Sequence, residues 1–348
     1  MRMLILIKSP EYAKKFSSLF EQFRLAGINI DVKYSFKHSR KNIIEDFFSQ
    51  VRNMLTYYCL DDDFSRWRWS RFVKFKFLLK FNLKRPLAFL ERFAPVPQFA
   101  REVSRYNAIF VIYRNAPCSC LETDYIKAAK RYRVPIFVMN SSWDSFETKG
   151  VMTVEPDATF VFNAWQKSWI ERVYQFRNVV VVGCPLLALG KASRPFYVTY
   201  LGSSKITGDG QALFERICQS LGDHPAIKFH PKNIFNISNI HQFDSLSEAL
   251  NQSSCVISLN SSTIIDAIAK GIPAIAIVEA GPISGIGHWK NICASGLVKT
   301  STISDLSRNI REWRGPLESL RDALLFPRKD SPKFITDYIL THVKRTMT

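Results

Sequence analysis

The chain has 348 residues, 47% of them hydrophobic, which is enough for two cores in domains of roughly 150 to 200 residues each. No apolar run reaches the roughly 18 to 20 residues of a membrane-spanning helix, and the apolar start is too short for a signal peptide, so we expect a soluble protein. The 48 Lys and Arg residues against 30 Asp and Glu residues give a formal net charge of +18, which indicates an anionic partner.

The cysteines indicate a reducing compartment. There are seven of them, scattered mostly through apolar stretches where cysteine behaves as a small hydrophobic residue. Cys118 and Cys120 lack the two-residue spacer of common zinc or redox pairs, and no matching pair follows them. We therefore expect free thiols and a cytoplasmic protein.

The first half of the chain alternates between strand and helix patterns. Strands are predicted at residues 4–7, 28–34, 108–113, 134–139, 159–163 and 179–183, and helices at 11–25, 42–58, 123–133 and 164–176. This βαβ repetition predicts a parallel sheet with helices on both faces, a Rossmann-like domain over residues 1–188.

A basic aromatic segment, residues 64–92, interrupts that domain. It holds nine basic residues against the single acid Glu91, interleaved with Trp and Phe. A solvated helix face does not need so many apolar residues, and no known nucleic-acid-binding fold surrounds the segment, so nucleic acid is the weaker alternative. We expect it to lie on an anionic membrane surface with its rings at headgroup depth.

A second series of strands and helices begins at residue 196. The Gly- and Pro-containing stretch before it marks a domain boundary. We predict a second Rossmann-like domain over residues 196–315 and C-terminal helices over 316–348 that cap it or cross back to the first domain. The predicted fold class is α/β, with two doubly wound domains facing one interdomain cleft.

Polar residues follow three successive strands of the second domain, where ligands bind in open α/β sheets. Strand 197–202 ends at Gly202, the next strand ends at His230-Pro231, and strand 255–259 runs into Asn260, Ser261, Ser262 and Thr263. Each has an ordinary interpretation alone: proline ends strands, and Ser or Thr caps helices. Together they predict a site for a phosphorylated ligand, because amides at helix starts favour anions and a histidine can donate to a leaving phosphate.

Two aspartates are candidates for the catalytic carboxylate. Asp209, in Gly208-Asp209-Gly210, precedes a helix of the second domain, and Asp144 lies in the loop 140–150 of the first domain. Either side chain could deprotonate an acceptor hydroxyl, or it could simply cap a helix or shape a loop. The residues leave this choice open.

The segment from Trp143 to Pro185 resembles the amino-terminal half of GT-B fold glycosyltransferases from bacterial surface-polysaccharide clusters. The second half is similar to enzymes that use CMP-activated acidic sugars, including Kdo transferases and sialyltransferases. Those carry an acidic-Gly motif, His-Pro and Ser-Ser/Thr in this order, which Asp209-Gly210, His230-Pro231 and Ser261-Ser262-Thr263 match.

The resemblance implies that a CMP-sugar binds in the second domain and a lipid-linked or lipopolysaccharide-core acceptor in the first. His230 and the hydroxyls would stabilise the departing phosphate without a metal or other cofactor. The residues that complete the implied nucleotide-sugar site are Gly202, Ser203, Ser204, Lys205, Lys232 and Asn260. The implied enzyme works in capsule or lipopolysaccharide synthesis, peripherally on the inner face of the cytoplasmic membrane.

Three alternatives remain. The first is a transferase with another donor, CDP-glycerol or a UDP-sugar. The second is a nucleotide-sugar 2-epimerase of similar fold, although the basic aromatic segment argues against it because a soluble epimerase needs no membrane contact. The third is a basic protein that binds nucleic acid.

Overall fold

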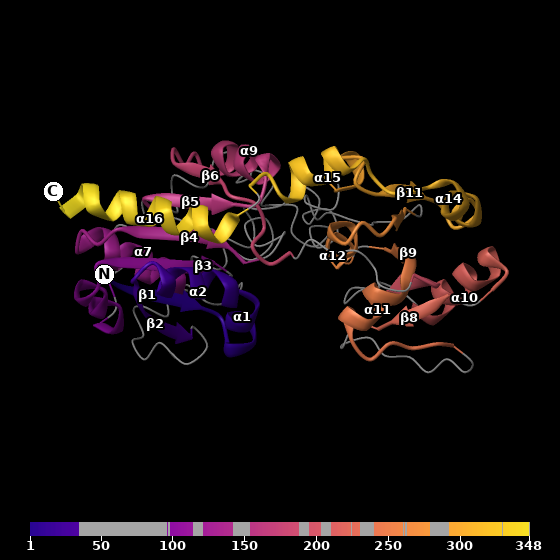
Figure 1. Ribbon diagram of the computed structural model, residues 1–348, viewed down its shortest axis with the longest axis horizontal. Helices are drawn as coiled ribbons and strands as arrows, with labels where there is room; N and C mark the ends of the chain where they lie inside the picture. The colour runs from indigo at the N-terminus through magenta and orange to yellow at the C-terminus, as the bar shows by residue number, and fades with distance from the viewer. Residues whose placement is uncertain are drawn as a thin grey trace, which may run out of the picture. The chain divides into compact units, whose positions relative to one another are not determined.

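The computed structural model divides the chain into two compact units, Met1–Leu186 with Phe326–Thr348 and Leu187–Leu325. Each unit contains a parallel sheet with helices packed on it (Figure 1). The structure describes residues 1–34, 96, 98–113, 121–141, 154–187, 195–202, 210–223, 225–229, 240–259, 261, 263–278, 292–328 and 330–347. We refer to the two parts as unit 1 and unit 2.

Unit 1 has six described strands in the order β2-β1-β3-β4-β5-β6, and every neighbouring pair is parallel. The strands are β1 (Arg2–Ile7), β2 (Asn29–Tyr34), β3 (Ala108–Tyr113), β4 (Ile136–Asn140), β5 (Ala158–Val161) and β6 (Val179–Val181). The described helices are α1 (Pro10–Lys15), α2 (Ser17–Leu25), the 3-10 helix η4 (Gln98–Arg105), α7 (Leu121–Arg131), α9 (Ala164–Val173) and α16 (Ser331–Met347).

The sheet of unit 1 is covered on both faces, which explains its continuous apolar strands. On one face, residues such as Leu4 and Ile109 pack with Tyr125 and Ile126 of α7. On the other face the aromatic rings of β4 and β5 meet α16, and the yellow α16 packs against the indigo α2 (Figure 1). The last helix of the chain therefore completes the core begun by the first strands.

Unit 2 has five described strands in the order β11-β10-β9-β7-β8, again all parallel. They are β7 (Tyr197–Leu201), β8 (Ala226–Lys228), β9 (Ser253–Ser258), β10 (Ala274–Ile277) and β11 (Lys299–Ser301). The described helices are α10 (Gly210–Leu221), α11 (Leu246–Gln252), α12 (Ile264–Ala269), α14 (Leu306–Glu312) and α15 (Glu318–Leu325).

The core of unit 2 lies between its sheet and the helices α10 and α14. Phe214 and Ile217 of α10 and Leu306 of α14 pack on alternate residues of the strands, among them Tyr200 and Ile257. The tail divides at residue 325, because α15 belongs to unit 2 and α16 to unit 1.

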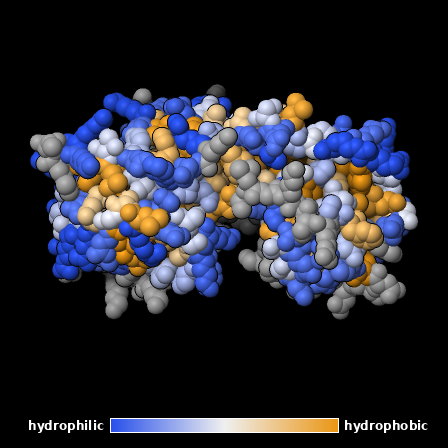
Figure 2. All heavy atoms as spheres, in the orientation of Figure 1, coloured by the Kyte–Doolittle hydropathy of each residue, from blue (hydrophilic) through white to orange (hydrophobic). Residues whose placement is uncertain are grey.

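The surface is mainly polar. Hydrophilic residues cover much of the visible face of both units, and hydrophobic residues form smaller patches on each unit (Figure 2). Within the described ranges, no helix is both long enough and apolar enough to span a bilayer.

Candidate functional site

The strand order of unit 2 places a topological switch point between β7 and β9. From β7 the chain moves to β8 on one side of the sheet, and β9, β10 and β11 follow on the other side. In open α/β sheets ligands bind beyond the carboxyl ends of the strands at such a point. Gly202, directly after β7, and Ser261, shortly after β9, occupy those positions.

The two strand ends are joined by the side chain of Ser258, the last residue of β9. Its fully buried hydroxyl lies 3.1 Å from the carbonyl oxygen of Leu201, to which it donates, and it accepts a hydrogen bond of 3.1 Å from the amide of Ser261. The amide of Gly202 in turn donates to the carbonyl of Lys228, at 2.9 Å. These bonds fix the ends of β8, β7 and β9 relative to one another.

Two hydroxyl groups lie together after β9. The Oγ of Ser261 is 2.6 Å from the Oγ1 of Thr263, and the Ser261 residue is 9% exposed. Thr263 precedes α12, but its side chain makes no capping hydrogen bond. Because one hydrogen bond uses only one of the two hydroxyl protons, the pair keeps a donor for an incoming oxygen, such as that of a phosphate.

Lys228 adds a positive charge at the end of β8. Its ammonium group donates to the carbonyl of Phe229 at 3.0 Å. An ammonium group has three N–H donors, and this hydrogen bond uses one of them. The described part of the site thus combines hydroxyl donors with a cation, which is the chemistry that binds phosphate.

The structure describes only part of the predicted site. Of the predicted residues it describes Gly202, Ser261 and Thr263, and it brings all three to the switch point. The other predicted site residues lie outside the described residues; they are Asp144, Ser203, Ser204, Lys205, Asp209, His230, Lys232, Asn260 and Ser262. The basic aromatic segment 64–92 also lies outside them. The roles of all the predicted site residues, including Gly202, Ser261 and Thr263, stay predictions.

Sequence reasoning missed Ser258 and Lys228. Both are polar residues at the last position of an apolar strand. This is a usable signal, because the final side chain of a strand reaches the same edge as the loop after it. The described residues include no group of three His, Cys, Asp or Glu side chains arranged to hold a metal ion.

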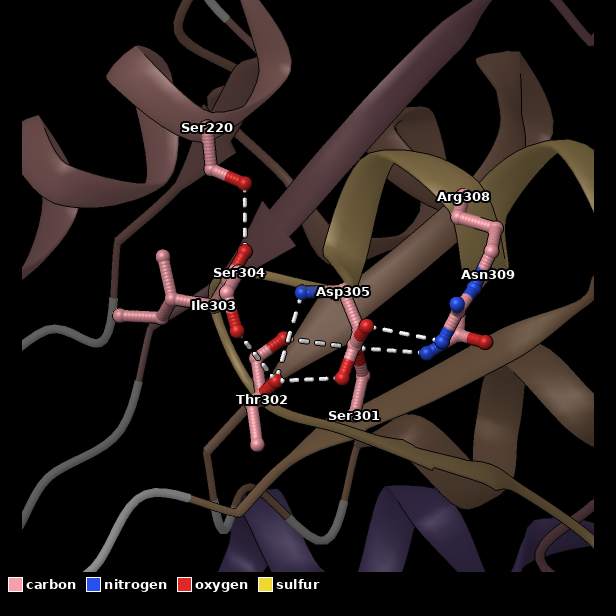
Figure 3. Close-up of polar contacts among 8 residues, drawn as sticks. All are labelled: Ser220, Ser301, Thr302, Ile303, Ser304, Asp305, Arg308 and Asn309. Carbon is pink, nitrogen blue, oxygen red and sulfur yellow. Dashed lines mark hydrogen bonds and ion pairs between the residues drawn. The ribbon is translucent and has the colours of Figure 1, made fainter.

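A second polar cluster of unit 2, after β11, has a structural role. Thr302 accepts from the amide of Asp305 at 3.3 Å and donates to its carboxylate at 2.9 Å, and that carboxylate accepts from Arg308 at 2.8 Å (Figure 3). Asn309 donates to Ser301, and Ser220 of α10 donates to the carbonyl of Ile303. Since the cluster is satisfied internally and fixes the start of α14, we assign it no ligand.

The corresponding edge of unit 1 also carries polar groups. Asn140 and Ser141 at the end of β4 are buried, as are Glu122 and Asp124 at the start of α7. The pKa of Glu122 is raised to about 7, chiefly by burial and also by Asp124, with Lys8 partly opposing the rise. This edge therefore contains a buried carboxyl group whose pKa is raised toward neutral pH.

Comparisons with known proteins identify the fold. No family model matches the chain, and no curated protein matches it in sequence. Among solved structures it is similar to the UDP-GlcNAc 2-epimerase of Methanocaldococcus jannaschii in complex with UDP-GlcNAc and UDP. The TM-score is 0.58 at 12% identity, over 98% of this chain and 100% of that one.

Two further solved structures are similar to this chain over nearly its whole length. A putative UDP-N-acetylglucosamine 2-epimerase from Listeria monocytogenes has a TM-score of 0.56 at 10% identity, over 99% of this chain and 97% of the other. The S. aureus MnaA–UDP structure has a TM-score of 0.52 at 11% identity, over 99% and 96%. With its two parallel Rossmann-like sheets, the chain has the GT-B fold, as the sequence predicted.

Proposed function

We propose that this protein is a glycosyltransferase that uses a nucleotide-activated sugar and binds the nucleotide at the switch point of unit 2. The observation that carries the proposal is the junction of β7 and β9, where Ser258 fixes the strand ends and Ser261 and Thr263 present hydroxyl donors. These groups would hold the phosphate that leaves when the sugar is transferred.

We propose a uridine nucleotide as the carrier, in place of the CMP that the sequence resemblance implied. The similar structures include complexes with UDP-GlcNAc and with UDP. No comparison supports CMP-Kdo or CMP-sialic acid as a donor. A diphosphate is also the larger anion, and it would use the hydroxyl pair and Lys228 together.

The acceptor is proposed from the sequence. The basic aromatic segment 64–92 has the composition of an interfacial membrane element. A transferase that builds a lipid-linked saccharide for the cell surface needs to lie on the inner face of the cytoplasmic membrane. We therefore propose a lipid-linked or lipopolysaccharide-core acceptor, with the segment holding the enzyme on anionic lipid.

A UDP-sugar 2-epimerase is the second candidate. The three similar structures reported above favour it, since all have the same fold and two are named as such epimerases. An epimerase needs one substrate and no acceptor. The two candidates therefore predict different products from the same starting mixture.

A product assay tests the proposal. The full chain is incubated with UDP-GlcNAc, UDP-glucose, UDP-galactose and, for comparison, a CMP-linked acidic sugar, each with and without a membrane lipid extract. We expect acceptor-dependent release of UDP and a glycosylated lipid. Conversion of UDP-GlcNAc to its 2-epimer without an acceptor supports the second candidate, and turnover of the CMP-sugar alone contradicts the proposed donor.

A further inference from the structure

Unit 1 has its own topological switch point, between β1 and β3. From β1 the chain moves to β2 on one side of the sheet, and β3 to β6 follow in order on the other side. Lys8 directly follows β1, and α7 begins shortly after β3. In a sheet of this kind a ligand binds beyond the strand ends on either side of this point.

Glu122 lies at that point, and its carboxyl group is buried with one oxygen unpaired. It is the second residue of α7, is 3% exposed, and its Oε2 is buried without a hydrogen-bond partner. Its own backbone amide hydrogen-bonds the carboxyl group. A buried polar atom without a partner costs free energy, so its presence calls for a reason.

Burial, more than the neighbouring charges, raises the pKa of Glu122. The pKa of Glu122 is raised to about 7, mainly by loss of water on burial and to a smaller extent by the carboxylate of Asp124, while its own backbone amide and the ammonium of Lys8 act against the rise. The ammonium group of Lys8 also lies 5.5 Å from the centre of the Tyr12 ring.

In the described part of the chain, Asp124 and Lys8 are the charged groups that act on Glu122. Strands β3 and β4 end in the paired residues Tyr113 and Asn140, which are polar but uncharged. The carboxylate of Glu102, on η4, accepts hydrogen bonds from Tyr125 and Lys33. Glu102 is thus a satisfied carboxylate in the same unit, which makes it a matched control.

We propose that Glu122 is the acid–base residue of this protein, and that the switch point of unit 1 binds the hydroxyl-bearing saccharide whose proton Glu122 accepts. This inference rests on the proposed function. A saccharide hydroxyl bound at this point would supply the donor that the buried Oε2 lacks. Groups that accept a proton in catalysis work best with a pKa near the working pH.

The reaction balances with this assignment. The acceptor's O–H bond breaks and its proton moves to Glu122. The oxygen's electron pair forms the new bond to the anomeric carbon of the nucleotide sugar. The bond from that carbon to the phosphate oxygen breaks, and the nucleotide leaves with the electron pair.

The experiment compares the full-length wild type with Glu122→Gln and the control Glu102→Gln. Consumption of UDP-GlcNAc in the presence of lipid extract is followed from pH 5.5 to 8.5, and the thermal shift caused by UDP is measured on each protein. We expect a wild-type rate that rises with an apparent pKa near 7. Glu122→Gln should lower the rate roughly 100-fold or more and remove this pH dependence, while its UDP-induced shift stays at the wild-type value.

Glu102→Gln should keep the wild-type pH profile. Carbon-13 NMR of labelled glutamate carboxyl groups, assigned by difference from Glu122→Gln, reports the ionisation of Glu122 directly and independently of activity. Wild-type turnover in Glu122→Gln, or titration of Glu122 near its ordinary pKa, overturns this inference while UDP binding is retained. A wild type that neither binds UDP nor consumes UDP-GlcNAc contradicts the proposed function, and this inference with it.

Discussion

The proposed nucleotide site depends on the hydrogen bonds of a few individual residues. Ser258 is the most important of them, because one buried hydroxyl serves both the carbonyl of Leu201 and the amide of Ser261. Its removal takes one hydrogen bond from each of these two backbone groups. Such losses are costly where no water replaces the lost bond.

Ser258→Ala should therefore lower the free energy of unfolding by roughly 1 to 3 kcal/mol. It should also weaken nucleotide binding, since the loop that carries Ser261 loses its anchor. Chemical denaturation of the full chain and titration with UDP measure the two effects. Ser254→Ala, at the exposed amino end of the same strand, is the control, and it should change stability by less than about 0.5 kcal/mol. Equal effects of the two substitutions would contradict the role given to Ser258.

Glu122 predicts a specific dependence of stability on pH. Burial raises its pKa to about 7 from an ordinary value of 4.5, so the folded protein holds this proton more tightly than the unfolded chain. The stabilisation is complete below pH about 4.5 and is lost as the pH rises through about 7. Relative to Glu122→Gln, the wild type should lose roughly 3 kcal/mol of unfolding free energy over this window. Parallel stability curves for the two proteins would show that the group titrates normally.

At the scale of elements, the alternation of strands and helices was sufficient to predict the fold. Buried parallel strands read as continuous apolar runs, and β1 and β3 are clear cases. The tail was less predictable, because α15 and α16 have similar amphipathic patterns but pack in different units. A helix pattern shows which face is buried and does not identify the partner.

The sequence predicted where some residues of the candidate site lie, while their binding roles stay predictions. Gly202 and Ser261 stand at strand ends, where the sequence alone indicates a ligand. Glu122 looks like an ordinary first-turn acid on a solvated helix. Only the packing of α7 on the sheet reveals that it is buried.

Helix α16 should contribute a large part of the stability of unit 1. Ile339 is fully buried, and the neighbouring rings of Tyr338 and His342 meet Phe160 and Phe137 edge to face. Ile339→Ala should cost about 2 to 5 kcal/mol by denaturant unfolding, because the lost side chain leaves a cavity. Leu25→Ala removes a similar side chain from a site that is 74% exposed and should have little effect. A small effect of Ile339→Ala would argue that α16 is dispensable.

For the whole molecule, net charge and the basic aromatic segment predict membrane association. The chain carries a formal charge of +18, and basic residues near an anionic surface contribute about 1 kcal/mol each. The full chain should sediment with vesicles containing phosphatidylglycerol and remain in solution with neutral vesicles. Binding should weaken at high salt, because ions screen these attractions.

Replacing Arg66, Arg68 and Arg71 with glutamine should reduce that binding without changing the thermal shift caused by UDP. Replacement of Arg308, Arg311 and Arg314 in unit 2 removes the same charge outside the segment and is the control. Equal losses from both triple variants would mean that net charge acts alone and that the segment has no special role.

The proposed nucleotide site is tested most directly by calorimetric titration of the wild type and of a Ser261→Ala, Thr263→Val double variant with UDP, UMP, CDP and CMP. The account predicts that UDP binds the wild type most tightly and that the double variant loses roughly 10-fold or more in affinity, as expected for one or two lost hydrogen bonds to a charged group. Binding of UDP that is unchanged in the double variant, or no binding of any nucleotide to the wild type, would contradict it.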